Sequence, residues 1–337
     1  MDNFQNYAFV IDKPNQSQPS FTRPLVIKKE DGKQPQKSDI KFFIEPILKH
    51  ASFLQNDDGS QWSLTFFQNT RFEKTLLVSC QNEATEPSFC AAKAAHLTSS
   101  ANLETTPEEL IKVSQFTRSS NSLQATDITN LKSDACLITD RKALVFQTKE
   151  SKEYSEDRFK RVVVALCLAL AYRSTMLEFM SELTDSVKQQ NHEGTLQLYE
   201  KILYFNAGDY FRYPVSPERH ELFAVWNLVS DHLKLQELNC ELTEQLTHVG
   251  LLLQKHRDRL RYEQEENKKQ ALADAEKARR EQEVKMERSF NRRAARLGFV
   301  LGALSLFSLL SLVELTPEHF SSAYSNWLQP FFISGDP

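Results

Sequence analysis

A cluster of arginines beside an apolar run is the place where residue types and spacing predict a definite chemistry. Arg288, Arg292, Arg293 and Arg296 come directly before residues 297–313, which contain no charged residue. Guanidinium groups in this position can bind anionic lipid headgroups, at roughly 1 kcal/mol each. The same charges also set the topology of an adjacent membrane helix. Both interpretations, lipid binding and topology alone, fit the pattern.

Two glycines inside the apolar run predict contact between helices. Gly298 and Gly302 lie one helical turn apart, and Ser305 continues roughly the same face. Small residues at this spacing let two membrane helices approach closely. We therefore expect Gly298, Gly302 and Ser305 to form a helix-association face. A chance arrangement within an apolar run is the alternative.

The rest of the chain lacks the motifs of common enzyme and metal sites. It contains no Gly-rich phosphate loop, no HExxH, no GxSxG and no Asp-rich metal loop. The five cysteines have no CxxC or Cys/His spacing, which predicts reduced thiols and no zinc site. We therefore predict no enzyme activity, no metal and no cofactor; an enzyme within residues 41–150 is the alternative. The scattered histidines are interpreted as structural or solvated: His50, His96, His192, His220, His232, His248 and His256.

Residues 297–315 predict a single transmembrane helix. No charge occurs in this run until Glu314, and at ~1.5 Å per residue it spans ~27 Å, close to the thickness of a bilayer core. Arginines crowd its N-terminal side, and no Lys or Arg follows Arg296. The positive-inside rule then places residues 1–296 in the cytoplasm. Because little chain follows the span, we expect a single-pass, tail-anchored protein of an inner or cytoplasmic-facing membrane.

The segment after the span, residues 316–337, predicts a short amphipathic helix in the far membrane interface. Thr316-Pro317-Glu318 is a typical helix start. Its apolar positions follow at spacings of three and four, and are Phe320, Ala323, Tyr324, Trp327 and Leu328. Aromatic residues such as Trp327 are enriched at membrane interfaces. An unstructured hydrophobic stub is the alternative.

The N-terminal half predicts a flexible arm followed by a small α+β domain. Residues 1–40 are rich in Asn, Gln, Ser, Pro and Lys, with few apolar residues apart from one short strand-like run, PLVIKK. In residues 41–150, Asp58-Gly59 separates strand-like runs, and ACLIT and ALVFQ flank a second turn. Between these hairpins, Thr106-Pro107 begins a short helix.

The C-terminal half predicts a helical core and a charged stalk. Residues 155–254 carry apolar positions at helical spacing, and residues 162–171 are too short an apolar run to cross a membrane, which favours a buried helix. Ser216-Pro217 is expected to begin one very long helix. Its residues 255–296 are charged on nearly every face, which favours a solvated stalk over a weak coiled coil.

The predicted fold is an α+β cytoplasmic domain followed by a helical bundle with one very long helix running into a single transmembrane helix. Residues 130–315 combine paired strands (ACLIT, ALVFQ), a helix rich in small residues (VALCLALAYRSTMLEFM), a Pro-containing loop (YPVSPERHELFAVW) and a terminal membrane helix. This architecture resembles that of the CorA-like superfamily. It is most similar to the single-anchor branch of "required for meiotic nuclear division" type proteins. No Gly-Met-Asn follows the span, so the resemblance does not imply magnesium selectivity.

These features together predict a non-enzymatic, tail-anchored protein whose cytoplasmic domain self-associates as a scaffold or sensor at the membrane. The expected partners are membrane lipids and further copies of the chain. A net charge of −4 argues against nucleic-acid binding. The alternative is an oligomeric, CorA-like, ion-conducting or membrane-perturbing protein, with Ser305, Ser308 and Ser311 as a partial polar lining.

Overall fold

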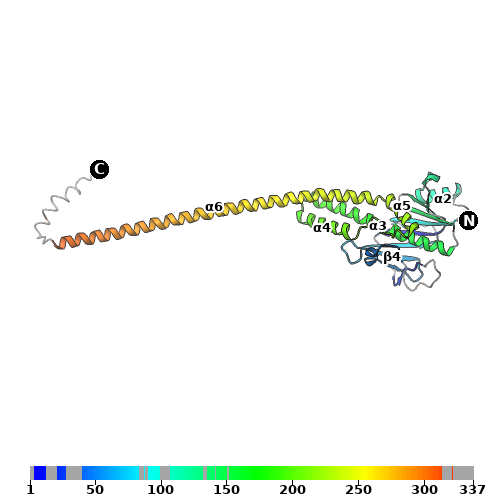
Figure 1. The fold of residues 1–337 in the computed structure, drawn as a ribbon, viewed down its shortest axis with the longest axis horizontal. Helices are drawn as coiled ribbons and strands as arrows, with labels where there is room; N and C mark the ends of the chain where they lie inside the picture. Colours follow the sequence, from blue (N-terminus) through cyan, green and yellow to red (C-terminus); the bar gives the residue numbers. More distant parts are fainter. Residues whose placement is uncertain are drawn as a thin grey trace. The chain divides into compact units, whose positions relative to one another are not determined.

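The computed structural model describes residues 4–12, 21–27, 40–82, 87, 90–98, 107–131, 135–140, 142–149, 152–312 and 321. The chain divides into two compact units, Met1–Lys255 and His256–Pro337 (Figure 1). The division falls within one residue of the predicted boundary between the helical core and the stalk.

One mixed sheet organises the first unit. Its nine described strands have the order β2-β3-β4-β5-β1-β6-β9-β8-β7, and every neighbouring pair is antiparallel except β6 and β9. The strands are β1 Phe4–Asp12, β2 Arg23–Pro24, β3 Ser52–Gln55, β4 Gln61–Phe66, β5 Lys74–Gln81, β6 Ala92–Thr98, β7 Thr129–Leu131, β8 Ala135–Asp140 and β9 Ala143–Thr148. The two predicted hairpins are confirmed as β3–β4 and β8–β9.

Strand β1 lies in the middle of this sheet, between β5 and β6. Ala8, Phe9 and Val10 are fully buried, and Ala8 pairs with both Cys80 and Ala94. The prediction of a flexible arm over residues 1–40 is therefore wrong for this segment. Its polar neighbours lower the average hydrophobicity of the region, while the partners that stabilise the strand are far along the chain.

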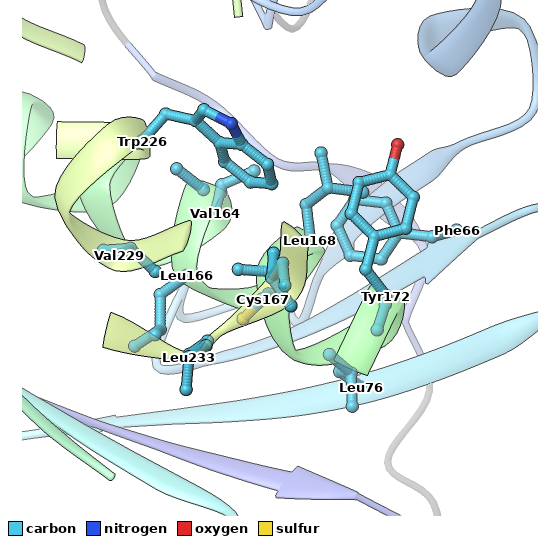
Figure 2. Packing of buried hydrophobic residues seen from close by; sticks show 14 of the residues in the cluster. Phe66, Leu76, Val164, Leu166, Cys167, Leu168, Tyr172, Trp226, Val229 and Leu233 are labelled. Atoms are coloured by element: carbon cyan, nitrogen blue, oxygen red, sulfur yellow. The ribbon is translucent and has the colours of Figure 1, made fainter. Parts of the chain in front are cut away.

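Three helices cover one face of the sheet: α3 Lys152–Lys188, α4 His192–Gly208 and α5 His220–His232. Figure 2 shows side chains of α3, among them Leu168 and Tyr172, in one cluster with Trp226 of α5 and Phe66 of β4. Tyr172 is fully buried, and its hydroxyl donates to Asp209 O (2.9 Å) and accepts from Phe211 N (3.2 Å). The polar group that the fold buries is thus satisfied by the loop that follows α4.

Strands and helices share one hydrophobic core. A single buried cluster contains Leu64 of β4, Leu144 of β9, Leu168 of α3 and Val225 of α5. The predicted division into an α+β domain, residues 41–150, and a separate helical core, residues 155–254, is therefore wrong. An apolar helix and the apolar face of a sheet each need a partner layer, and here each is the partner of the other.

Helix α2, Pro107–Arg118, covers the opposite face of the sheet and confirms the helix predicted at Pro107. Its Val113 packs with Phe9 and Val145 in a second buried cluster. Arg118 at its end bonds the carboxylates of Asp127 (3.1 Å) and Asp140. α2 thus lies in the connection that returns the chain from β6 to the parallel strand β9.

The long helix α6, Leu235–Leu312, begins later than predicted. Lys234 has a left-handed backbone (φ 57°), and this separates α5 from α6, so the expected uninterrupted helix from Ser216 is wrong. Neither Gly nor Pro marks the break. Leu233 and Leu235 on either side are buried, at 8% and 0% exposed, so packing holds the turn in place.

The first turns of α6 complete the core, as the apolar stripe predicted. Leu235, Leu242 and Leu246 are buried, and Gly250 lies against Tyr199 of α4. From residue 257 onward, every described side chain of α6 except Ala303 is exposed. The helical part of the second unit, from His256 to Leu312, extends over roughly 85 Å.

Candidate membrane-anchoring site

The end of α6 presents apolar side chains on all of its faces. The large ones between residues 297 and 309 are 52–80% exposed: Leu297, Phe299, Val300, Leu301, Leu304, Leu306, Phe307 and Leu309. Three consecutive residues, Phe299, Val300 and Leu301, point in three directions about 100° apart. The apolar surface therefore surrounds the helix, unlike the one-sided stripe of a helix that packs on a core.

Among the described residues, one helical segment is long and apolar enough to cross a membrane, Ser155–Lys188 of α3. Its apolar window is 78% buried inside the protein. The prediction that residues 162–171 belong to a buried core helix is therefore confirmed. The predicted span 297–315 continues past Leu312, and its last residues, like the predicted interfacial helix with Trp327, lie outside the described part of the chain.

Four arginines occupy the turns of α6 just before the apolar surface. Arg288, Arg292, Arg293 and Arg296 are all exposed. In α6 further from the apolar end, ion pairs form at i,i+4 between Arg259 and Glu263 (3.0 Å) and between other exposed residues. The pair Glu276–Arg280 is among them, at 2.7 Å. Exposed pairs of this kind contribute little stability, which agrees with a solvated stalk.

The predicted association residues share one open face of α6. A methyl group added at Gly298 or Gly302 would meet no atom within 4 Å. The hydroxyl of Ser305 donates to Leu301 O (2.6 Å) and lies 3.2 Å from Gly302 O. Since the helix itself satisfies this hydroxyl, Ser305 can enter an apolar environment without losing a hydrogen bond.

Among the described histidines the core encloses His96, whereas His50, His192, His220 and His248 are exposed. His96 is fully buried between the rings of Phe146 and Phe159, and its Nε2 lies 3.1 Å from the Thr148 hydroxyl. Burial, with the nearby charge of Arg158, lowers the pKa of His96 to about 4. The ring is therefore neutral and enclosed at pH 7, a structural role that agrees with the sequence interpretation.

Burial also suppresses thiol reactivity. It raises the pKa of Cys80 and of Cys136 to about 12, and raises that of Cys167 as well. A nucleophilic cysteine needs an accessible thiolate, and these three thiols are protonated at pH 7. Cys136 and Cys167 are also buried, whereas Cys240 is exposed. Within the described ranges, no group of three His, Cys, Asp or Glu side chains could hold a metal ion.

An open groove of about 450 Å³ lies between α4 and the turn that joins β4 to β5. Sequence reasoning missed it, because its two walls are more than a hundred residues apart. One of its cations, Lys201, is paired with Glu182 (3.5 Å). Cations, a carboxylate, an amide and aromatic rings mix in the groove, so it has no single ligand chemistry. Its lining residues are Arg71, Phe72, Gln197, Glu200, Lys201 and Tyr204.

No family model, curated protein or solved structure matches the chain.

Proposed function

We propose that this chain is a single-pass, tail-anchored membrane protein without enzyme activity. Its transmembrane helix is formed by residues 297–315, and its cytoplasmic unit, Met1–Lys255, self-associates as a scaffold or sensor at the membrane surface. The observation that carries the proposal is the apolar surface surrounding the end of α6.

The free energy of hydration supports a membrane environment for this surface. Burying one large apolar side chain is worth about 1.5–3 kcal/mol. The eight large side chains between residues 297 and 309 are partly shielded by the helix itself. Leaving their exposed surface in water still costs on the order of 10 kcal/mol. A bilayer removes this cost on all faces at once, whereas a single packing partner covers one face.

Charge supports the orientation. Arg288, Arg292, Arg293 and Arg296 precede the apolar surface, and no Lys or Arg follows it. Cations are retained on the cytoplasmic side of a span. The unit Met1–Lys255 is therefore cytoplasmic and the C-terminus external. A reporter active only in the cytoplasm, fused after Pro337, is expected to be silent; activity there would overturn the orientation.

Gly298, Gly302 and Ser305 support self-association within the membrane. Lipid tails are as apolar as leucine, so helices gain little from hydrophobicity and depend on close backbone contact. Both glycines leave open space beside the helix. A second copy of the same helix fits such a flat strip.

The experiment that tests the proposal is truncation after Glu287. The full chain is expected in the membrane fraction after alkaline carbonate extraction, and the truncated chain in the soluble fraction with its fold intact by circular dichroism. A full chain released by carbonate would refute the anchor. A truncated chain that aggregates would show that the core needs the apolar segment.

An ion-conducting or membrane-perturbing ring similar to the CorA-like superfamily is the second candidate function. The observation that favours it is the set of hydroxyl residues Ser305, Ser308 and Ser311 inside the apolar segment. They lie at i, i+3 and i+6 and give a partial polar lining. The mass of the detergent-solubilised full chain separates the two candidates, since a monomer or dimer cannot form a ring pore and a pentamer can.

A further inference from the structure

The arginines before the apolar surface have no acidic residue at the helical positions beside them, unlike most other cations of α6. On a helix, a cation meets the residues three and four positions away. For Arg288, Arg292 and Arg296 none of these positions holds Asp or Glu, and the same is true of Arg293. Glu287 is the last carboxylate before Glu314. By contrast, Arg259, Arg279 and Arg280 each contact a glutamate at 2.7–3.3 Å.

Three of these arginines also share one side of the helix. Arg288, Arg292 and Arg296 recur every four residues, and Arg293 lies about 60° beyond Arg296, toward the apolar side. Phe290 lies two positions from both Arg288 and Arg292, which places it about 200° round the helix from each. Phe290 is 70% exposed, and Met286, one turn before it, is 65% exposed. The segment therefore has a cationic face and an apolar face on opposite sides.

From this separation we infer that residues 286–297 bind the anionic lipid headgroups of the cytoplasmic leaflet, a partner class more specific than membrane lipid in general. The inference rests on the proposed membrane anchor, which holds the segment at headgroup level. Four guanidinium groups without carboxylates would repel one another, and lipid phosphates neutralise them with bidentate hydrogen bonds. Clusters of cations immediately before a membrane helix on its cytoplasmic side are typical of segments that bind anionic lipid headgroups.

The test is native mass spectrometry of the full chain in detergent micelles, titrated with phosphatidylglycerol or with phosphatidylcholine of the same acyl chains. Each arginine near an anionic surface contributes about fivefold, so the four contribute on the order of 500-fold. The full chain is expected to prefer phosphatidylglycerol by that order. The triple variant Arg288→Gln, Arg292→Gln and Arg296→Gln should keep only the roughly fivefold preference that Arg293 contributes, whereas lysine at the same three positions should retain most of the full preference.

The matched control is Arg259→Gln, Arg279→Gln and Arg280→Gln, which removes the same charge from arginines that have glutamate partners. It should leave the preference unchanged. Equal binding of both lipids by the full chain, or an equal loss in the two glutamine variants, would overturn the inference while leaving the anchor in place. A full chain that stays monodisperse without detergent would refute the anchor and the inference together.

Discussion

Helix α3 and the end of α6 are both long apolar helices, and they differ in what surrounds them. Val163, Leu168 and other residues of α3 are 0% exposed, because the sheet, α4 and α5 pack around them. On α6, Phe299 is 80% and Phe307 72% exposed. Apolar composition therefore shows that a helix avoids water, but tertiary partners decide whether protein or lipid replaces it.

An acidic side chain should lower the stability of the fold when placed in α3, the largest effect expected here, and should weaken membrane insertion when placed at the end of α6. Leu168→Asp places a carboxylate without a partner in a closed core, and is expected to lower the free energy of unfolding by about 4 kcal/mol or more. Leu304→Asp should leave that free energy unchanged and weaken membrane insertion by about 3 kcal/mol. Urea unfolding followed by tryptophan fluorescence, together with carbonate extraction, measures both. If Leu304→Asp unfolds the unit Met1–Lys255, the end of α6 is packed against the core and does not differ from α3 in its surroundings.

Acid should destabilise the unit that contains α3 through His96, which packs against Phe159 of that helix. The pKa of His96 is lowered from 6.5 to about 4 in the folded chain by burial and by Arg158. Between these values the unfolded chain binds the extra proton, so stability is fully present above pH 6.5 and falls as the pH drops toward 4. The loss should reach about 3 kcal/mol.

The control for this acid effect is His96→Phe, which cannot take up a proton. Its free energy of unfolding should depend less steeply on pH between 4 and 6.5 than that of the unmodified chain. Identical slopes in urea unfolding curves across that window would assign the acid sensitivity to other groups. The helicity of α6 should persist in either case, because its described residues beyond 256 have no part in the core.

Within the apolar end of α6, a bulky residue should act on association alone. Gly302→Ile fills the open strip beside the helix and is expected to weaken self-association in the bilayer by about 1 kcal/mol. Leu309→Ile is nearly isosteric and serves as the control. Energy transfer between labelled full-length chains in vesicles measures the effect. Equal results for the two variants would assign any oligomer to the helices of the unit Met1–Lys255.

The smallest effect is expected in the stalk between these two regions. Arg280→Gln removes an ion pair with Glu276 whose side chains are 74% and 65% exposed. Exposed positions of this kind usually change stability by within ~0.5 kcal/mol. Urea unfolding should show no measurable shift. A loss near that of Leu168→Asp would mean that the stalk is packed against a partner rather than solvated.

Local signals made much of this fold predictable from the sequence. Asp58-Gly59 and the turn before Ala143 predicted the two hairpins, and Pro107 predicted α2. The stripe that includes Leu242 and Leu246 predicted the buried start of α6. The candidate site was predictable residue by residue, because arginines, glycines and apolar side chains on one helix need only sequence spacing to be placed.

What escaped prediction depends on contacts between distant parts of the chain. β1 is held by strands that start more than sixty residues later, and its own composition is that of a polar segment. The turn at Lys234 has neither Gly nor Pro, and its left-handed backbone is held by the burial of Leu233 and Leu235. The groove that includes Arg71 and Tyr204 likewise exists only once α4 lies beside the sheet.

The central position of β1 has a consequence for the timing of synthesis. β1 leaves the ribosome before both of its neighbours in the sheet, which are complete only after Thr98 has been added. At about 5–20 residues per second, β1 waits roughly 4–17 s for them. During that interval Phe9 and Val10, fully buried in the finished sheet, are open to chaperones. Removing the first dozen residues would therefore split the sheet at its middle instead of trimming an end.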